Sequence, residues 1–397
     1  MKKILLLAPQ PFYTERGTPI AVLNLSHALI ESGYVVDILT FPHGEDIAIG
    51  GLTIHRVGKW LPLPKKLPVG FSFRKLILDF IMLFKAVSLC RHHDYIALHG
   101  VEEAAFIALA ARKLSRSPNN IKPRVIYDMD SSMSDQLVER WPSLSIVHHL
   151  FDGFEGYAVR HVDQILAVCQ ALKDKCEQHT GHAPVTVIED ISDNRSPNQQ
   201  NNTAENEVDD LTKVLPHLQK KILYVGNLEH YQGVGLVLEA MAEKTTPSEI
   251  GFIIIGGQAD DIARYQQLAD QLGISDKVAF LGPRPVGHLN AYLAQADILA
   301  SPRLKGVNTP MKIYTYLGAG KPILATKIAS HTQVLNEKNA LLAEPNAAAM
   351  ATGLATLYQD QALASNLAEQ AQQDAQAKYS YARFKVRIAE FYQTLLA

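Results

Sequence analysis

The chain has 397 residues, of which 47% are hydrophobic and 20% are charged, and its formal net charge is −2. This length indicates two domains with sizeable cores, while the near-neutral charge gives no reason to expect nucleic-acid binding. Three scattered cysteines do not form a disulfide framework or a zinc pair, and no uninterrupted run of 18 apolar residues is present to span a membrane. We therefore expect a cytoplasmic protein without a metal or a bound cofactor.

The first half of the sequence alternates apolar runs with helical patterns. The run at residues 3–8 ends at Pro9-Gln10, so it indicates a buried first strand and not a signal peptide. The loop that follows has one glycine where a dinucleotide fingerprint has three, which leaves NAD binding poorly supported. Strands are expected at 34–41, 52–57, 94–99, 124–130, 163–169 and 185–190, and helices at 20–32, 102–114 and 151–160. This alternation indicates a doubly wound α/β domain with a parallel sheet.

The strand at residues 124–130 brings polar side chains to its carboxyl end. These are Asp128, Asp130, Ser131 and Ser132. Ligands of parallel sheets sit at this edge, so the four side chains are candidates for ligand contact. The alternative is that Asp130 or Ser131 caps the next helix, and the sequence leaves both open.

Residues 59–85 combine basic and apolar side chains. The basic ones are Lys59, Lys65, Lys66, Arg74, Lys75 and Lys85, with Asp79 as the one acid. An apolar helical stripe runs through Leu76, Ile77, Phe80, Leu83, Phe84 and Val87. Such a segment suits the surface of an anionic membrane, which would place the protein on the inner face of the membrane. The alternative is an ordinary core helix beside a solvated basic loop.

The chain changes character at residues 192–210, which hold almost no apolar side chains. Such a composition cannot bury a core and indicates a domain boundary. A second α/β series follows, with strands expected at 220–226, 251–257, 277–282 and 297–302. Each half is thus expected to be a doubly wound parallel sheet, with the ligand in the cleft between the halves.

Residues 301–326 form the most informative stretch of the second half. A small-residue loop with Arg303, Lys305 and Asn308 leads to a helix that starts at Thr309-Pro310, and an apolar strand follows. A helix start offers unpaired N–H groups to an anion, and the basic side chains add positive charge. The alternative is an ordinary strand–loop–helix–strand unit. The segment Gly-Ala-Gly-Lys-Pro at 318–322 lacks the spacing and the Ser or Thr of a phosphate loop.

The order and spacing of several segments resemble glycosyltransferase family 4, a family of retaining enzymes with the two-domain GT-B fold. The resemblance covers nearly the whole chain and rests on residues 16–40, 158–174, 222–241, 278–303 and 310–326. It implies an acceptor-side domain at 1–190 joined by a C-terminal helix at 378–397, a flexible polar linker at 191–219, and a nucleotide-sugar-binding domain at 220–377. It also implies metal-independent transfer from a nucleotide-diphosphate sugar to a glycan or lipid-linked acceptor in surface polysaccharide or glycolipid assembly.

The sequence departs from the family pattern at five polar positions. Val307 and Thr315 stand where the family usually has two glutamates, and Asn227 and Gln232 stand where an Arg and a Lys usually grip the diphosphate. Asp130 replaces a common His. We expect Asp130 and Lys312 to be catalytic. The expected donor-binding residues are Gly17, Thr18, Gly226, Asn227, Gln232, Gly257, Arg284, Arg303, Lys305, Asn308, Thr309, Pro310 and Thr315.

Three functions fit these departures. In the first, Arg303, Lys305 and Lys312 replace the missing positive charge, and the chain is an active transferase. In the second, transfer is lost, and the chain is a nucleotide-sugar-binding or partner protein. In the third, the chain is a sugar-nucleotide epimerase, which shares the double-domain fold; the match to donor-loop sequences disfavours it. We favour the first.

Overall fold

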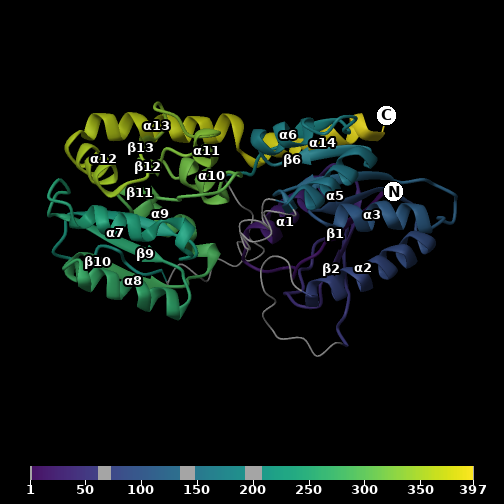
Figure 1. Ribbon diagram of the computed structural model, residues 1–397, viewed down its shortest axis with the longest axis horizontal. Helices are drawn as coiled ribbons and strands as arrows, with labels where there is room; N and C mark the ends of the chain where they lie inside the picture. Colours follow the sequence, from purple (N-terminus) through teal and green to yellow (C-terminus); the bar gives the residue numbers. More distant parts are fainter. Residues whose placement is uncertain (1, 61–72, 135–147, 193–207, 397) are drawn as a thin grey trace. The chain divides into compact units, whose positions relative to one another are not determined.

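The computed structural model describes residues 2–60, 73–134, 148–192 and 208–396 (Figure 1). Over these residues the chain forms two compact units. The first contains Met1–Asp190 together with Ala382–Ala397, and the second contains Ile191–Tyr381. No helix in these described ranges combines the length and the apolar character needed to cross a bilayer.

Within its described residues, the first unit holds a seven-stranded parallel sheet in the order β3-β2-β1-β4-β5-β6-β7. The strands are β1 (Lys3–Ala8), β2 (Val35–Thr40), β3 (Leu52–Arg56), β4 (Tyr95–Val101), β5 (Arg124–Met129), β6 (Gln164–Ala167) and β7 (Val185–Val187). The helices are α1 (Gly17–Glu31), α2 (Phe73–His92), α3 (Ala104–Leu114), α5 (His148–His161), α6 (Gln170–Glu177) and α14 (Tyr381–Leu396).

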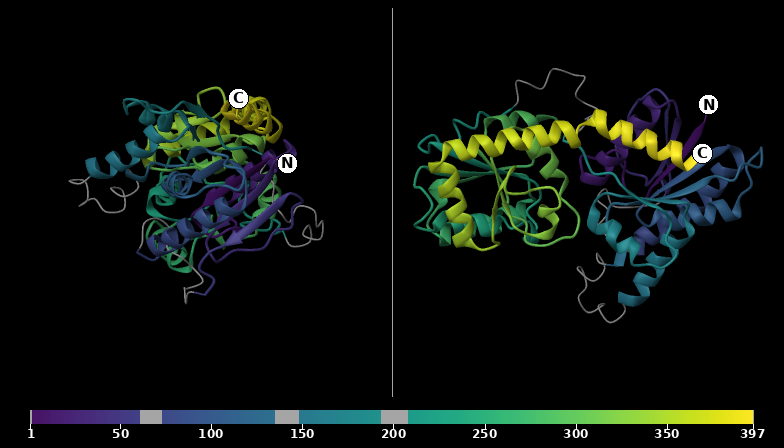
Figure 2. Two further views of the ribbon diagram at one scale, coloured as in Figure 1. Left: turned by 90° about the vertical axis from the view of Figure 1, so that its right-hand side faces the viewer. Right: turned by 90° about the horizontal axis from the view of Figure 1, so that it is seen from above.

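Helices cover both faces of this sheet, which is why its central strands, such as β1 and β4, are mostly apolar. Residues 4–8 of β1 are completely buried, as a continuous apolar run in a parallel sheet requires. One core joins the sheet to α2, α3, α5 and α6. The C-terminal helix α14 also lies along this unit (Figure 2), where its Tyr392 reaches the buried His99 of β4.

The second unit repeats the same winding. Its described strands form a six-stranded parallel sheet in the order β10-β9-β8-β11-β12-β13. They are β8 (Lys220–Val225), β9 (Ile250–Ile255), β10 (Val278–Gly282), β11 (Ile298–Ser301), β12 (Ile323–Thr326) and β13 (Leu341–Ala343). The helices are α7 (Val234–Ala242), α8 (Ala259–Gln271), α9 (Leu289–Gln295), α10 (Met311–Gly318), α11 (Ala329–Thr332), α12 (Ala347–Gln359) and α13 (Gln361–Lys378), with short 3₁₀ turns η4 (His230–Gln232), η5 (Ser275–Lys277) and η6 (Val286–His288).

The prediction of a flexible linker at 191–219 is wrong for its second part, residues 208–219. Residues 193–207 lie outside the described residues, but from residue 208 onward the chain packs onto the second unit. Leu211 is fully buried and Leu218 is 8% exposed, and Asp209 accepts hydrogen bonds from Arg284 and Tyr292. The cause is the spaced apolar residues from Leu211 on, which bury against the unit although their neighbours are polar. At the other end, Lys378 closes α13 of the second unit, so the C-terminal helix starts at Tyr381 and not at residue 378.

Candidate functional site

The carboxyl edge of the second sheet contains a switch point, where β8 and β11 are neighbours and the chain winds away in opposite directions. Two close backbone approaches shape it. A Cβ atom on Gly256 would lie 2.1 Å from the carbonyl oxygen of Gly226, and one on Gly233 would lie 1.9 Å from that of Pro302. Gly256 and Gly233 have φ angles of 113° and 73°. Glycine at these two positions therefore lets the loops after β8, β9 and β11 meet.

Lys312, in the first turn of α10, reaches this edge with its ammonium group. Its Nζ donates to the Oε1 atom of Gln232 at 3.2 Å and lies 4.0 Å from the ring centroid of Tyr224. A Cβ atom on Gly226 would come within 2.8 Å of the same nitrogen. Among the described residues, no carboxylate forms an ion pair with it. Burial, and after it the nearby Arg303 guanidinium, lower the pKa of Lys312 to about 7.

Arg303 organises the loop between β11 and α10. Its Nε donates to the carbonyl of Lys305 at 2.5 Å, and its Nη1 donates to the carbonyl of Asn308 at 3.1 Å. The guanidinium also lies 5.4 Å from the ring centroid of Tyr231. The hydroxyl of Thr326 donates to the Arg303 carbonyl. The Lys305 side chain is exposed. The loop therefore has two cations: Arg303, which is held by carbonyl groups of the loop, and Lys305, which is in solvent.

Two buried hydroxyl groups at this edge have no hydrogen-bond partner in the described part of the chain. Thr309 is 3% exposed and Ser330 is fully buried, yet neither Oγ atom is paired. Thr309 stands just before α10, whose first-turn N–H groups have no partner inside the helix. An unpaired buried hydroxyl costs roughly 1–3 kcal/mol. The edge therefore offers hydrogen-bond donors that the oxygen atoms of a ligand would satisfy.

His331 connects the ends of two strands behind this edge, and the sequence analysis missed it. Its Nδ1 lies 2.8 Å from the carbonyl oxygen of Thr326, and its Nε2 lies 3.0 Å from the hydroxyl of Ser301. The carbonyl accepts only, so Nδ1 carries the proton and Nε2 accepts from the hydroxyl. Burial lowers the pKa of His331 to about 4, which keeps the ring neutral near pH 7. A lone histidine outside any periodic pattern gives no sequence signal for this role.

We expect the His331→Leu variant to be less stable than the wild type. The change leaves the buried Ser301 hydroxyl without its partner, at roughly 1–3 kcal/mol, and removes one of two hydrogen bonds to the Thr326 carbonyl, which still accepts from the N–H of Ile328. The measurement is thermal unfolding followed by circular dichroism, with a fall in Tm of several degrees as the result. His217→Leu, at an exposed histidine of the same unit, is the control. An equal fall in both variants would contradict the role of His331.

In the first unit, Asp130 follows β5 and lies close to the start of α1. Burial raises the pKa of Asp130 well above its usual range, and the carboxylates of Asp128 and Glu102 raise it further. A hydrogen bond from Thr18 has a smaller, opposite effect. The raised pKa favours the protonated form of this carboxyl, which can donate a hydrogen bond. Its catalytic role stays a prediction.

The other polar groups near the end of β5 are bound to protein partners. The carboxylate of Asp128 accepts from Nε2 of His99 at 2.8 Å, and Nδ1 of the same ring lies 2.7 Å from the hydroxyl of Tyr392. The Ser131 hydroxyl donates to Glu102 at 2.5 Å. Of the charged residues predicted at this edge, Asp128 is thus tied into a buried chain that ends on α14.

The structure gathers most of the predicted residues of the second unit at its carboxyl edge. These are Gly226, Asn227, Gln232, Gly257, Arg303, Lys305, Asn308, Thr309, Pro310 and Lys312. Thr315 is 4% exposed and lies inside α10. Arg284 is engaged elsewhere, because its Nε donates to the carboxylate of Asp209 at 2.7 Å. In the first unit, Gly17 begins α1 and is exposed.

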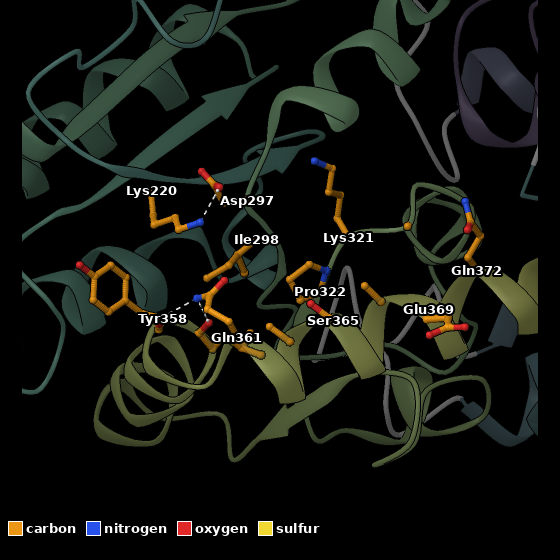
Figure 3. A pocket seen from close by; sticks show the side chains of 14 residues that line it. Lys220, Asp297, Ile298, Lys321, Pro322, Tyr358, Gln361, Ser365, Glu369 and Gln372 are labelled. Carbon is orange, nitrogen blue, oxygen red and sulfur yellow. Dashed lines mark hydrogen bonds and ion pairs between the residues drawn. The ribbon is translucent and has the colours of Figure 1, made fainter.

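A hollow of about 400 Å³ lies at the opposite end of the same strands (Figure 3). The amino ends of β8 and β11, the segment before β12, and helices α12 and α13 line it. Lys220 pairs with Asp297 at 3.1 Å on its rim. Ligands of doubly wound sheets bind at the carboxyl ends of strands, and Lys312 with the unpaired hydroxyls is found there. We therefore place the candidate site at the carboxyl edge and not in this hollow.

Each unit is a doubly wound parallel-sheet domain of the Rossmann-like type, and two such domains in one chain make up the GT-B fold. The sequence matches two family descriptions, "Glycosyltransferase Family 4" at residues 16–190 and "Glycosyl transferases group 1" at residues 209–374. The chain belongs to glycosyltransferase family 4. The resemblance drawn from the sequence and the expected GT-B fold are thereby confirmed.

Solved structures share the fold over the whole chain. Sucrose-phosphate synthase from Thermosynechococcus elongatus is 17% identical with a TM-score of 0.76, covering 100% of this chain and 99% of that one. HepE from Anabaena, solved with UDP-glucose, is 17% identical with a TM-score of 0.70, covering 99% and 100%.

Curated relatives match a shorter part of the sequence. The D-inositol 3-phosphate glycosyltransferase of Corynebacterium urealyticum is 32% identical over 46% of this chain and 44% of its own length. The phosphatidyl-myo-inositol mannosyltransferase of Mycobacterium leprae is 24% identical over 45% of this chain and 48% of its own length. The chain thus spans less than half the length of these curated relatives.

Proposed function

We propose that this chain transfers a sugar from a nucleotide-diphosphate donor to an acceptor hydroxyl with retention of anomeric configuration. The observation that carries the proposal is the 3.2 Å contact between Nζ of Lys312 and Oε1 of Gln232. Position 232 is where the family usually has a lysine for the diphosphate, and Asn227 stands where it usually has an arginine. Lys312 therefore brings an ammonium group from α10 to the place where the family's own cation is missing.

The chemistry needs positive charge at this place. As the bond between the sugar C1 atom and the diphosphate oxygen breaks, negative charge grows on the leaving group, and cations or N–H groups aimed at it lower the barrier. Lys312, the first-turn N–H groups of α10 and the hydroxyl of Thr309 lie at one edge. In a front-face displacement, the acceptor oxygen bonds to C1 on the face that the diphosphate leaves. The leaving phosphate oxygen takes the proton of the acceptor, so retention needs no second carboxylate.

The names of similar proteins guide the choice of substrates. HepE was solved with UDP and with UDP-glucose, which makes uridine donors the first to try. The curated relatives are named for inositol 3-phosphate and for phosphatidyl-myo-inositol, so a polyol or a lipid-linked polyol is a reasonable first acceptor. In its protonated form, which its raised pKa favours, Asp130 in the first unit would offer a hydrogen bond to an acceptor oxygen.

An assay with a panel of donors tests the proposal. Purified protein is incubated with UDP-, GDP- and ADP-sugars, with either inositol 3-phosphate or a membrane extract as acceptor, and products are identified by mass spectrometry and NMR. A new glycoside with the donor's anomeric configuration is the expected result. Donor binding without transfer would instead support the nucleotide-sugar-binding protein. Release of an epimerised sugar without an acceptor would support the epimerase.

We further propose that the first unit contacts a membrane surface through α2. The predicted apolar stripe divides in the structure: Val87 is buried, whereas Phe80 and Phe84 are 61% and 60% exposed. The two exposed rings pack edge to face with centroids 4.8 Å apart. The inner side of the helix packs into the core through Leu78 and Met82, both fully buried. A helix that fills the core on one side and exposes aromatic rings on the other suits an interface.

The charge around this outer face favours an anionic surface. Arg74 and Lys85 are exposed on the same helix, while Lys75 turns inward to pair with Glu103. Trp60, the last described residue before residues 61–72, is 76% exposed. Two further basic residues predicted for this contact, at positions 65 and 66, lie outside the described residues. A surface with cations beside exposed aromatic side chains binds a membrane with anionic lipid headgroups more strongly than a membrane with neutral headgroups.

We expect the double variant F80S/F84S to lose membrane binding. Each phenylalanine that enters the interface contributes roughly 1.5–3 kcal/mol, so the fraction bound should fall at least tenfold. The measurement is sedimentation with vesicles of phosphatidylglycerol and phosphatidylcholine, compared with phosphatidylcholine alone. Phe154→Ser, at a residue 55% exposed on α5, is the matched control and should bind as the wild type does. Wild-type sedimentation of the double variant would refute the contact.

A further inference from the structure

The ammonium group of Lys312 is surrounded by neutral and positive groups. On β8 it meets the Tyr224 ring, and on η4 it meets the amide of Gln232. The loop after β11 adds the Arg303 guanidinium, which acts on Lys312 as a like charge. On α11 the titratable group is His331, which is neutral near pH 7 because burial lowers its pKa to about 4. The ring and the amide are favourable to a cation, but neither neutralises it.

This arrangement disfavours the charged form of the lysine. Loss of solvent and a like charge both favour the neutral amine, and they lower the pKa of Lys312 to about 7. The empty site therefore holds one permanent cation, Arg303, and one amine that is about half protonated at neutral pH. A diphosphate brings negative charge to the same edge, and an anion nearby favours the ammonium form.

We propose that Lys312 takes up a proton when the nucleotide diphosphate binds, so that the site acquires its second cation only together with its anionic ligand. The inference rests on the proposed function and adds to it a coupling between diphosphate binding and proton uptake. The sign follows from the two states: the pKa of Lys312 is low in the empty site and higher in the loaded one. Binding therefore consumes protons between these two pKa values, and affinity falls as pH rises above 7.

The linkage also gives the site selectivity. A neutral nucleoside supplies no anion to raise the pKa of Lys312, so it binds without proton uptake and with little dependence on pH. A nucleoside diphosphate gains the full charge-assisted contact. The site would thus distinguish the intact diphosphate from a nucleoside most strongly at or below pH 7.

Calorimetry with UDP and GDP tests the proposal. Titrations of the full chain at pH 7, 8 and 9, in buffers of different ionisation enthalpy, give the number of protons taken up. The last phosphate proton titrates near pH 6, so this window isolates the protein. We expect about half a proton at pH 7, close to one at pH 8, and an affinity that falls by up to about tenfold per pH unit above pH 8. Uridine, the nucleoside control, should show no uptake.

The Lys312→Arg variant separates the lysine from other groups, because arginine stays protonated throughout this range. It should bind UDP or GDP with no proton uptake and a flat pH dependence. The Lys312→Met variant should bind more weakly and also without uptake, which gives a second check if arginine does not fit. Wild-type binding without uptake, or equal uptake in the Lys312→Met variant, would overturn the inference alone. Failure of every nucleotide to bind would overturn the proposed function with it.

Discussion

The Lys312→Met variant is expected to lose about 10- to 150-fold in kcat/KM for sugar transfer, with most of the loss in kcat. Removal of a charge-assisted phosphate contact costs about 1.5–3 kcal/mol, and each 1.4 kcal/mol is tenfold in rate. Because the charge on the leaving diphosphate is largest in the transition state, the loss falls on turnover more than on donor binding. The measurement is steady-state kinetics with the donor selected by the panel.

A second substitution tests whether the rate depends on a positive charge at this place in the site and not on Lys312 itself. Gln232 lies 3.2 Å from the Lys312 ammonium, so K312M/Q232K places a lysine on η4 where the family usually has one. We expect the double variant to recover at least tenfold over K312M. Lys244→Met, at an exposed lysine of the same unit, is the control and should change the rate less than about threefold. If K312M kept the full rate and K305M lost most of it, the cation that stabilises the leaving diphosphate would be Lys305 of the loop and not Lys312.

The Gly233→Ala variant is expected to lose both stability and donor binding. Gly233 has φ of 73° and lies between η4 and α7, and a Cβ atom there would lie 1.9 Å from the carbonyl oxygen of Pro302. The contact is with backbone, so the loop after β11 must move. We expect destabilisation of about 2–4 kcal/mol, from the left-handed conformation and the clash together. Thermal unfolding and nucleotide titration measure the two effects.

Gly273→Ala isolates the clash from the conformational cost. Gly273 has φ of 67°, close to that of Gly233, but a Cβ atom there would meet nothing within 4 Å. Its substitution should cost only roughly 1–2 kcal/mol and leave nucleotide affinity unchanged. If both variants lose the same stability and both keep their affinity, the close approach of Gly233 to Pro302 does not shape the site.

The fold was predictable because its signals are local and repeated. Most strands of the two sheets are short apolar runs followed by a helix, and parallel strands buried on both faces require that pattern. The region from Leu211 to Leu218 was misjudged for the opposite reason. Its apolar residues are few and lie among polar ones, and only the surface of the second unit decides that they become buried. The two-sided nature of α2 was likewise beyond the sequence, since an apolar stripe does not say which residues face the core.

The segment that forms the site was predictable, but the contacts between its side chains were not. The basic loop and the helix start at Thr309-Pro310 could be found because anion sites need positive charge and free N–H groups. The contact between Lys312 and Gln232 joins residues 80 positions apart, and no local pattern contains it. The same holds for His331, whose partners lie on two different strands. Arg284 looked like a donor contact because it is basic and follows a strand, whereas its pairing with Asp209 depends on how residues beyond 208 fold back.

The most direct test of the account is a crystal structure of the full chain with the nucleotide diphosphate that binds it best. We predict the diphosphate at the carboxyl edge of the second sheet, with phosphate oxygens within hydrogen-bond distance of Nζ of Lys312 and of the Thr309 hydroxyl. A nucleotide bound in the hollow beside Lys220 and Asp297, at the amino ends of the same strands, would contradict it.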